Sequence, residues 1–86
     1  MVIGKVVSRV ISTRKYDTLQ GYKLLVIEPL NGDTKEVFVA ADTIGAGEGE
    51  IVLVSFGSAV QHALHQQAPI DAIVVGIVDQ EPTMPK

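Results

Sequence analysis

The hydrophobic positions of the chain gather in five short runs that are rich in β-branched and aliphatic residues. These runs cover residues 1–13, 22–30, 34–41, 50–56 and 70–79. In the first run, apolar pairs recur every four residues, a spacing that alone would also suit a helix. β-branched side chains dominate it, however, and Gly4 and Ser8 weaken a helix. The pattern predicts five or six short strands in one all-β domain, a small, mostly antiparallel barrel.

The segments between the runs predict how the strands are connected. Residues 14–21 form a polar loop, and Pro29 marks the end or an edge position of the second strand. The Asn31-Gly32 pair predicts a type I′ hairpin turn, because both residues readily take positive φ. Residues 57–67 predict one short helix between the last two strands, with Ser58 as its N-cap. We expect a single domain over residues 1–80 and a polar, Pro-rich tail over residues 81–86.

The segment DTIGAGEGE, residues 42–50, places glycine at every second position between two apolar runs. A glycine loop that binds phosphate must lie directly before the N-terminus of a helix, whereas a strand follows here. The lysine and Ser/Thr of a P-loop are also missing. Glu48 and Glu50 would repel phosphate. The pattern favours a tight connection that needs the positive φ available to glycine.

Length and hydrophobicity together predict an oligomer. A single domain of 86 residues removes only a little over ~60% of its surface from water, yet 47% of the chain is hydrophobic. We expect the surplus apolar surface to lie in a subunit interface. No apolar run approaches the roughly 18 residues that span a bilayer, and no signal segment is present, so we expect a soluble, intracellular chain. The absence of cysteine excludes disulfides and cysteine-ligated metal sites.

Charge is unevenly distributed along the chain, although the net charge is only −3. Five of the seven basic residues lie in the first 23 positions: Lys5, Arg9, Arg14, Lys15 and Lys23. A basic first third and an acidic remainder can place opposite charges across a subunit contact, and they are equally compatible with two solvated faces. Net acidity argues against a nucleic-acid groove, which needs a positive field.

Candidate catalytic groups are scarce. His62 and His65 are spaced to share one helix face, but two ligands do not complete a metal site, and solvated surface histidines explain them better. Any two of Asp42, Asp71 and Asp79 could be imagined as an acid/base pair. Each also lies at a predicted strand end or turn, where Asp commonly caps free N–H groups. Ser58 lacks a base and an orienting group outside its own helix. We therefore expect neither an enzyme nor a bound cofactor.

Several motifs in order along the chain carry a resemblance to a known family. They are KLLVIE at residues 23–28, AADTIGAGEGEIVLVS at 40–55, GSA at 57–59 and PIDAIVVGIVD at 69–79. With these motifs the chain resembles the EutN/CcmL family, the pentameric vertex proteins of bacterial microcompartment shells, over nearly its whole length. The resemblance implies a compact OB-like barrel.

The resemblance also implies a function without catalysis. Five copies would form a ring that caps the five-fold corners of a carboxysome or metabolosome shell in the bacterial cytoplasm, beside hexameric shell proteins. Neither nucleic acid nor a membrane would be a partner. The residues that match the family motifs, as structural or possible subunit-contact or pore-rim positions, are Asp42, Ile44, Gly45, Gly47, Gly57, Ser58, Ala59, Gln61, Asp71, Gly76 and Asp79.

One position departs from the family pattern, and two other functions stay open. Gln61 stands where the family commonly has arginine, and a neutral amide cannot repeat an arginine's ion pairing. One alternative is a small OB-type nucleic-acid-binding module, which would need its few aromatic residues on a basic strand face. These are Tyr16, Tyr22, Phe38 and Phe56. The other is a small metal-dependent enzyme built on the two histidines.

Overall fold

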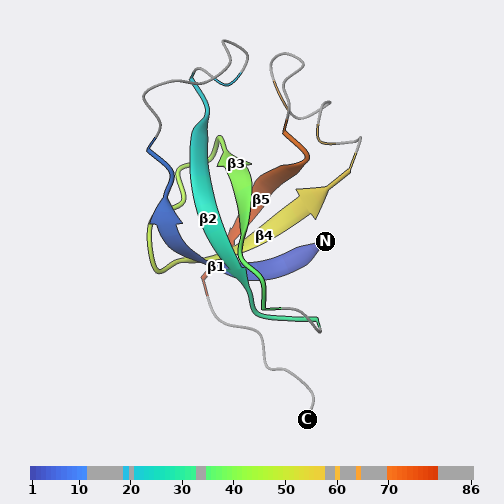
Figure 1. The fold of residues 1–86 in the computed structure, drawn as a ribbon. Coiled ribbons are helices and arrows are strands. Elements are labelled where there is room, and N and C mark those ends of the chain that lie inside the picture. The colour runs from blue at the N-terminus through green and yellow to red at the C-terminus, as the bar shows by residue number, and fades with distance from the viewer. Residues whose placement is uncertain are drawn as a thin grey trace.

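Five strands form a closed barrel in the computed structural model of the chain (Figure 1). The structure describes residues 1–11, 19, 21–32, 35–57, 60, 64 and 70–79. Within them lie β1 (Val2–Arg9), β2 (Lys23–Pro29), β3 (Phe38–Asp42), β4 (Ile51–Phe56) and β5 (Ala72–Val78). The all-β barrel predicted from the hydrophobic runs is confirmed, with five strands among the described residues.

The strands follow the order β1-β2-β3-β5-β4 around the barrel. β1 pairs with β2 and β4, β2 with β3, and β4 with β5, all antiparallel. The remaining neighbours, β3 and β5, are parallel and share two residue pairs, Ala41 with Ile73 and Asp42 with Val74. The barrel is therefore mostly antiparallel, as expected, and is closed by a short parallel seam, which the hydrophobic pattern did not predict.

Alternation along the strands sorts the apolar side chains into two clusters. Neighbouring residues of a strand point to opposite faces, so Ala40 belongs to the cluster inside the barrel and Ala41 to a second cluster outside it. The inner cluster consists of Val6, Leu25, Ile27, Ala40, Ala46, Val52, Val54, Ala72 and Val74. The outer cluster consists of Tyr22, Ala41, Val60, Leu64, Ile70 and Ile73, with Leu19 and Leu24 packed against it.

Gly4 allows β1 and β2 to approach closely. It is buried and pairs with Pro29 across the two strands. A Cβ atom built at Gly4 would collide with Cγ2 of Ile27, and it would lie 3.1 Å from the carbonyl oxygen of Glu28. Ile27 is fully buried in the inner cluster, so it has little room to move away. Glycine at position 4 is therefore a packing requirement of the barrel wall.

The predicted type I′ turn at Asn31-Gly32 is wrong. Gly32 has a φ of 93°, but no non-glycine residue in the described ranges has positive φ, and a type I′ turn needs it at both central positions. The β2–β3 connection is also longer than a two-residue turn, because β2 ends at Pro29 and β3 begins at Phe38. The Asn31 side chain instead accepts a hydrogen bond from the Ile3 amide at 3.0 Å, which ties this loop to β1. The antiparallel pairing of β2 with β3 is confirmed.

The predicted helix lies almost entirely outside the described residues, as do Ser58, Ala59, Gln61, His62, His65 and the tail over residues 81–86. Val60 and Leu64 are described, and both are buried in the outer cluster. The Val60 amide donates a hydrogen bond to the Gly57 carbonyl at 3.1 Å. No helix within the described part of the chain is long and apolar enough to cross a membrane.

Candidate functional site

The glycine loop between β3 and β4 is organised around the carboxylate of Asp42, which is fully buried at the end of β3. Oδ1 accepts hydrogen bonds from the amides of Ile44 and Gly45 at 3.0 and 3.2 Å, and Oδ2 accepts one from Ala46 at 2.7 Å. The loop does gather N–H groups around an anion, but the anion is the protein's own side chain. The interpretation of Asp42 as a cap is confirmed, and the loop has no vacant cradle for phosphate at this point.

Lys23 supplies the positive charge that this buried carboxylate requires. Its Nζ lies 3.6 Å from Oδ2 of Asp42 and donates a hydrogen bond to the Ala46 carbonyl. The two residues are direct partners in the β2–β3 register, which places the ammonium group beside the loop. Sequence reasoning missed this role, although a lysine at the first position of β2 would have been a usable signal once the strand register was known. A buried acid without such a partner would be strongly destabilising.

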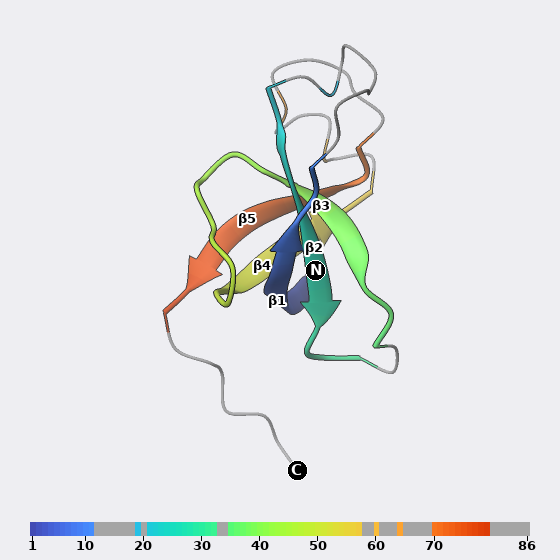
Figure 2. The same ribbon diagram turned by 60° about the vertical axis from the view of Figure 1, so that its left-hand side comes forward.

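The rest of the glycine loop is closed by contacts within the chain (Figure 2 shows the loop in yellow-green, linking β3 to β4). Glu50 Oε1 accepts a hydrogen bond from the Gly47 amide at 2.7 Å, and the Gly49 amide donates to the Val6 carbonyl of β1 at 2.8 Å. Gly45 and Gly49 have φ values of 92° and 86°, so both use the conformations that favour glycine. The prediction of a tight architectural connection is confirmed.

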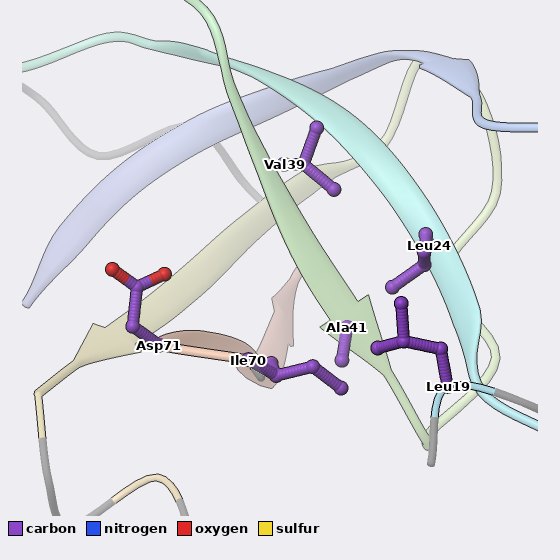
Figure 3. A pocket seen from close by; sticks show the side chains of 6 residues that line it. All are labelled: Leu19, Leu24, Val39, Ala41, Ile70 and Asp71. Carbon is purple, nitrogen blue, oxygen red and sulfur yellow. The ribbon is translucent and has the colours of Figure 1, made fainter. Parts of the chain in front are cut away.

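An apolar groove lies on the outside of the barrel where β2, β3 and the start of β5 meet. We call it the outer groove. It has a volume of about 230 Å³ and is lined by Leu19, Leu24, Val39, Ala41, Ile70 and Asp71. Figure 3 shows Leu19, Leu24 and Ala41 grouped near one another, Val39 farther along β3, and the Asp71 carboxylate on the other side of the groove. Among the described lining residues, Asp71 is the one polar side chain, which suits an apolar contact better than a reaction.

A smaller pocket of about 140 Å³ lies beside the Asp42–Lys23 pair. Arg9, Lys23, Leu25, Ala46, Gly47 and Glu48 line it. Its charges are mixed, since Glu48 accompanies the two basic residues, and Lys23 is already engaged by Asp42 and the Ala46 carbonyl. Its described lining therefore has no excess of unengaged positive groups that would select an anion.

The described residues that match the family motifs lie in three different places. Asp42, Ile44, Gly45 and Gly47 share the glycine loop. Gly57 and Asp71 meet elsewhere, where the Gly57 amide donates to the Asp71 carbonyl at 3.1 Å. Two more lie near the end of β5: Gly76 faces Leu53 of β4, and Asp79 follows the strand on the surface. Ser58, Ala59 and Gln61 lie outside the described residues. The described members of this set thus lie at turns and strand contacts in separate parts of the barrel.

The three described aromatic side chains pack against other apolar groups of the chain. Phe38 and Phe56 pack against each other with ring centroids 5.0 Å apart and an interplanar angle of 58°. Tyr22 is buried in the outer cluster, and Tyr16 is outside the described residues. Base stacking by a nucleic-acid binder needs rings that are open on a groove. In the described part of the chain, no group of three or more His, Cys, Asp or Glu side chains is placed to hold a metal ion.

Comparison with known proteins identifies the family. The family described as "Ethanolamine utilisation protein EutN/carboxysome" matches residues 1–79. The carboxysome shell vertex protein CcmL of Thermosynechococcus vestitus is 49% identical over 83 residues, which cover 92% of this chain and 84% of that protein. The solved GrpN pentameric microcompartment shell protein of Rhodospirillum rubrum is 45% identical, with a TM-score of 0.80 over 99% of this chain and all of that one.

A further solved structure, CcmL of a Nostoc species, agrees with these two. It is 43% identical and has a TM-score of 0.84, covering 94% of this chain and 92% of that one. The match is thus not confined to a motif but extends over the barrel as a whole. On the family match over residues 1–79 and on relatives this similar along their length, the chain belongs to the EutN/CcmL family.

Proposed function

We propose that this chain is a vertex protein of a bacterial microcompartment shell, and that five copies form a ring which caps the five-fold corners and closes the shell. One observation carries the proposal: the Rhodospirillum rubrum relative with the same fold and 45% identity is described as a pentameric microcompartment shell protein. Relatives from carboxysomes and from other microcompartments are likewise named shell vertex proteins. The ring would lie in the bacterial cytoplasm as part of the shell.

The structure supports a role that depends on contacts rather than on chemistry. The buried carboxylate of Asp42 and its partly exposed partner Lys23 hold a loop in place, and both are engaged by that contact. The exposed apolar side chains, in contrast, are numerous for a chain of this size: Met1, Val7, Ile11, Val37, Val39, Ile44, Phe56, Val75 and Ile77. Where such side chains form a contiguous patch, they commonly mark a surface that another subunit covers. We propose that the chain is a structural protein and not an enzyme.

The partners follow from the geometry of a closed shell. A flat layer of six-fold tiles cannot close without five-fold defects, so the proposed ring would meet hexameric shell proteins along its outer edge. We propose that residues 1–80 form the barrel domain that does this and that residues 81–86 are a tail outside it. Among the motif residues, the exposed Ile44 and Asp79 and the half-buried Gly76 are proposed as subunit-contact or rim positions.

Native mass spectrometry of the purified chain tests the assembly. We expect a homopentamer at micromolar concentration. A chain that stays monomeric there would contradict the proposal. Measuring at several concentrations separates a stable ring from weak association, because ring formation makes the apparent stability depend on protomer concentration.

Shell closure tests the function itself. The cognate hexameric shell proteins are produced with and without this chain, together with an encapsulated fluorescent reporter. Without the chain we expect open, elongated or permeable shells whose reporter is degraded by added protease. Restoring the chain should close the shells and protect the reporter, which electron microscopy and residual fluorescence would measure. Equally closed and protective shells in both preparations would remove the vertex role.

A further inference from the structure

Asn31 is the only asparagine of the chain, and Gly32 follows it directly. Asparagine is a chemically labile residue. It is most labile before glycine, because a glycine nitrogen has no neighbouring side chain to hinder its attack on the asparagine side chain. The pair lies outside the strand ladders, between the end of β2 at Pro29 and the start of β3 at Phe38. It is therefore a candidate site of covalent change within the chain.

The nitrogen that would attack belongs to Gly32, and the fold leaves it accessible. Gly32 is exposed and has a φ of 93°. A Cβ atom built at this position would meet nothing within 4 Å, so the surroundings are open. No residue in the described ranges accepts a hydrogen bond from the Gly32 amide. The described part of the barrel therefore does not engage this nitrogen.

The atom that would be attacked is Cγ of Asn31, and β1 holds a hydrogen-bond donor against its oxygen. Oδ1 of Asn31 accepts a hydrogen bond from the Ile3 amide at 3.0 Å. When a nitrogen adds to a carbonyl carbon, negative charge develops on the carbonyl oxygen, and a fixed N–H group aimed at that oxygen stabilises it. The Ile3 amide is fixed because Ile3 pairs with Leu53 of β4 and accepts a hydrogen bond from the Leu30 amide at 2.8 Å.

We infer that Asn31 is a site of spontaneous deamidation in the folded chain. The Gly32 nitrogen loses its proton to solvent and forms a bond to Cγ of Asn31, the Cγ–Nδ2 bond breaks, and ammonia leaves. The product is a five-membered succinimide ring. Water then opens the ring at either carbonyl, which gives aspartate or isoaspartate. The net change is hydrolysis of one amide to a carboxylate and ammonium, and water is the only co-reactant.

The two products differ in what they do to the contact between the loop and β1. Aspartate leaves the main chain unchanged, so an oxygen of its side chain can still accept the hydrogen bond from Ile3. In isoaspartate the main chain runs through the former side chain and gains a methylene group. The carbonyl that Ile3 contacted then belongs to the main chain, and its direction is set by the loop. We expect the isoaspartate form to release the loop from β1.

Intact mass and isoaspartate content test the site on the purified chain in its assembled state. The chain is kept in mildly alkaline buffer at physiological temperature and sampled over days. We expect the mass increase that replaces an NH2 group with OH, together with isoaspartate that an isoaspartate-specific methyltransferase labels. Both signals report position 31, because the chain has no other asparagine and no aspartate followed by glycine.

Two variants serve as matched controls. Asn31→Gln should abolish the isoaspartate signal, because attack on the longer side chain would have to close a six-membered ring. Gly32→Ala should slow the modification several-fold, because its methyl group hinders the attacking nitrogen. Thermal melts establish that each variant keeps the barrel. Isoaspartate that accumulates equally in Asn31→Gln would show that position 31 is not its source and would overturn the inference.

The role of the fold is tested by comparing the folded chain with the same chain unfolded in guanidinium chloride at equal pH. With the Ile3 donor in place, the folded chain should be modified at least as fast as the unfolded one. A slower rate in the folded chain would show that the hydrogen bond to Ile3 protects Asn31, and the inference would be wrong. Neither outcome depends on whether the chain forms a ring, so the proposed function is tested separately.

The effect on the loop is measured with the isoaspartate form, separated by ion exchange after incubation. Its matched control is Asn31→Asp, which has the same added negative charge and an unaltered main chain. We expect the isoaspartate form to melt at a lower temperature than Asn31→Asp. Equal melting temperatures would show that the loop stays attached to β1 and would overturn the expected release.

Discussion

Lys23 and Asp42 are opposite partners at one end of the β2–β3 ladder, with Nζ of the lysine 3.6 Å from Oδ2 of the aspartate. The same carboxylate accepts three backbone hydrogen bonds from the glycine loop. This one pair thus fixes the end of β3, the path of the loop and the start of β2. In a family whose members act by assembling, the most polar buried cluster of the described barrel serves the fold.

Asp42→Ala should lower the free energy of unfolding by about 3 kcal/mol, because it leaves three loop amides without their acceptor and Lys23 without its partner. Glu48→Ala, which removes an exposed carboxylate from the same loop, is the matched control and should change it by less than about 0.5 kcal/mol. Urea denaturation at a fixed protomer concentration measures both. Equal effects in the two variants would show that the loop does not depend on Asp42.

Phosphate should not stabilise the unmodified chain beyond the effect of sodium chloride at equal ionic strength, because Asp42 already occupies the amides of the glycine loop. In Asp42→Ala these amides become available, and a small carboxylate such as acetate should raise the melting temperature of that variant but not of the unmodified chain. Differential scanning fluorimetry measures the shifts. A phosphate-specific rise in the unmodified chain would restore the phosphate interpretation of the loop.

Gly4→Ala should destabilise the barrel by about 1–3 kcal/mol, since its Cβ would overlap Ile27 and crowd the β2 backbone. Gly76→Ala is the informative comparison, because its Cβ would meet Leu53 at 3.6 Å, an ordinary contact. It should change the stability of the protomer by less than about 0.5 kcal/mol. Thermal melts of the two variants at equal concentration test this difference. If Gly76→Ala proved the more damaging in a fully folded monomer, the packing account would be wrong.

We expect no binding of nucleic acid beyond a weak, salt-sensitive background. The net charge is −3, Tyr22 is buried and Phe38 packs against Phe56. Fluorescence anisotropy with labelled single-stranded DNA at moderate salt provides the measurement. Submicromolar affinity that persists as salt is raised would instead favour the OB-type nucleic-acid module.

The sequence pattern predicted the strands correctly where the local composition of one segment was enough to identify it. β-branched runs located all five strands, because a strand buried on one or both faces needs such residues. The role of Asp42 as a cap could also be inferred, since a strand-terminal Asp before a glycine loop has free amides within reach.

What the pattern missed depended on contacts between distant segments. The Asn31 side chain accepts a hydrogen bond from the amide of Ile3, 28 positions away. The loop that carries Asn31 is longer than the expected tight turn. Lys23 could be recognised as the partner of Asp42 only once the strand register was known. The parallel seam likewise arises from the three-dimensional order of the strands. Local propensity contains none of this information.

The seam between β3 and β5 gives the barrel wall a preferred place to open. Only two residue pairs, Ala41 with Ile73 and Asp42 with Val74, join these strands. Amide protons along this line should therefore exchange with deuterium sooner than those of the longer β4–β5 ladder. The outer groove lies beside this seam, between β3 and the start of β5. A neighbouring subunit that covered the groove would therefore hold the two strands together. Assembly would then slow exchange at the seam first, so the wall would gain its full rigidity only in the finished ring.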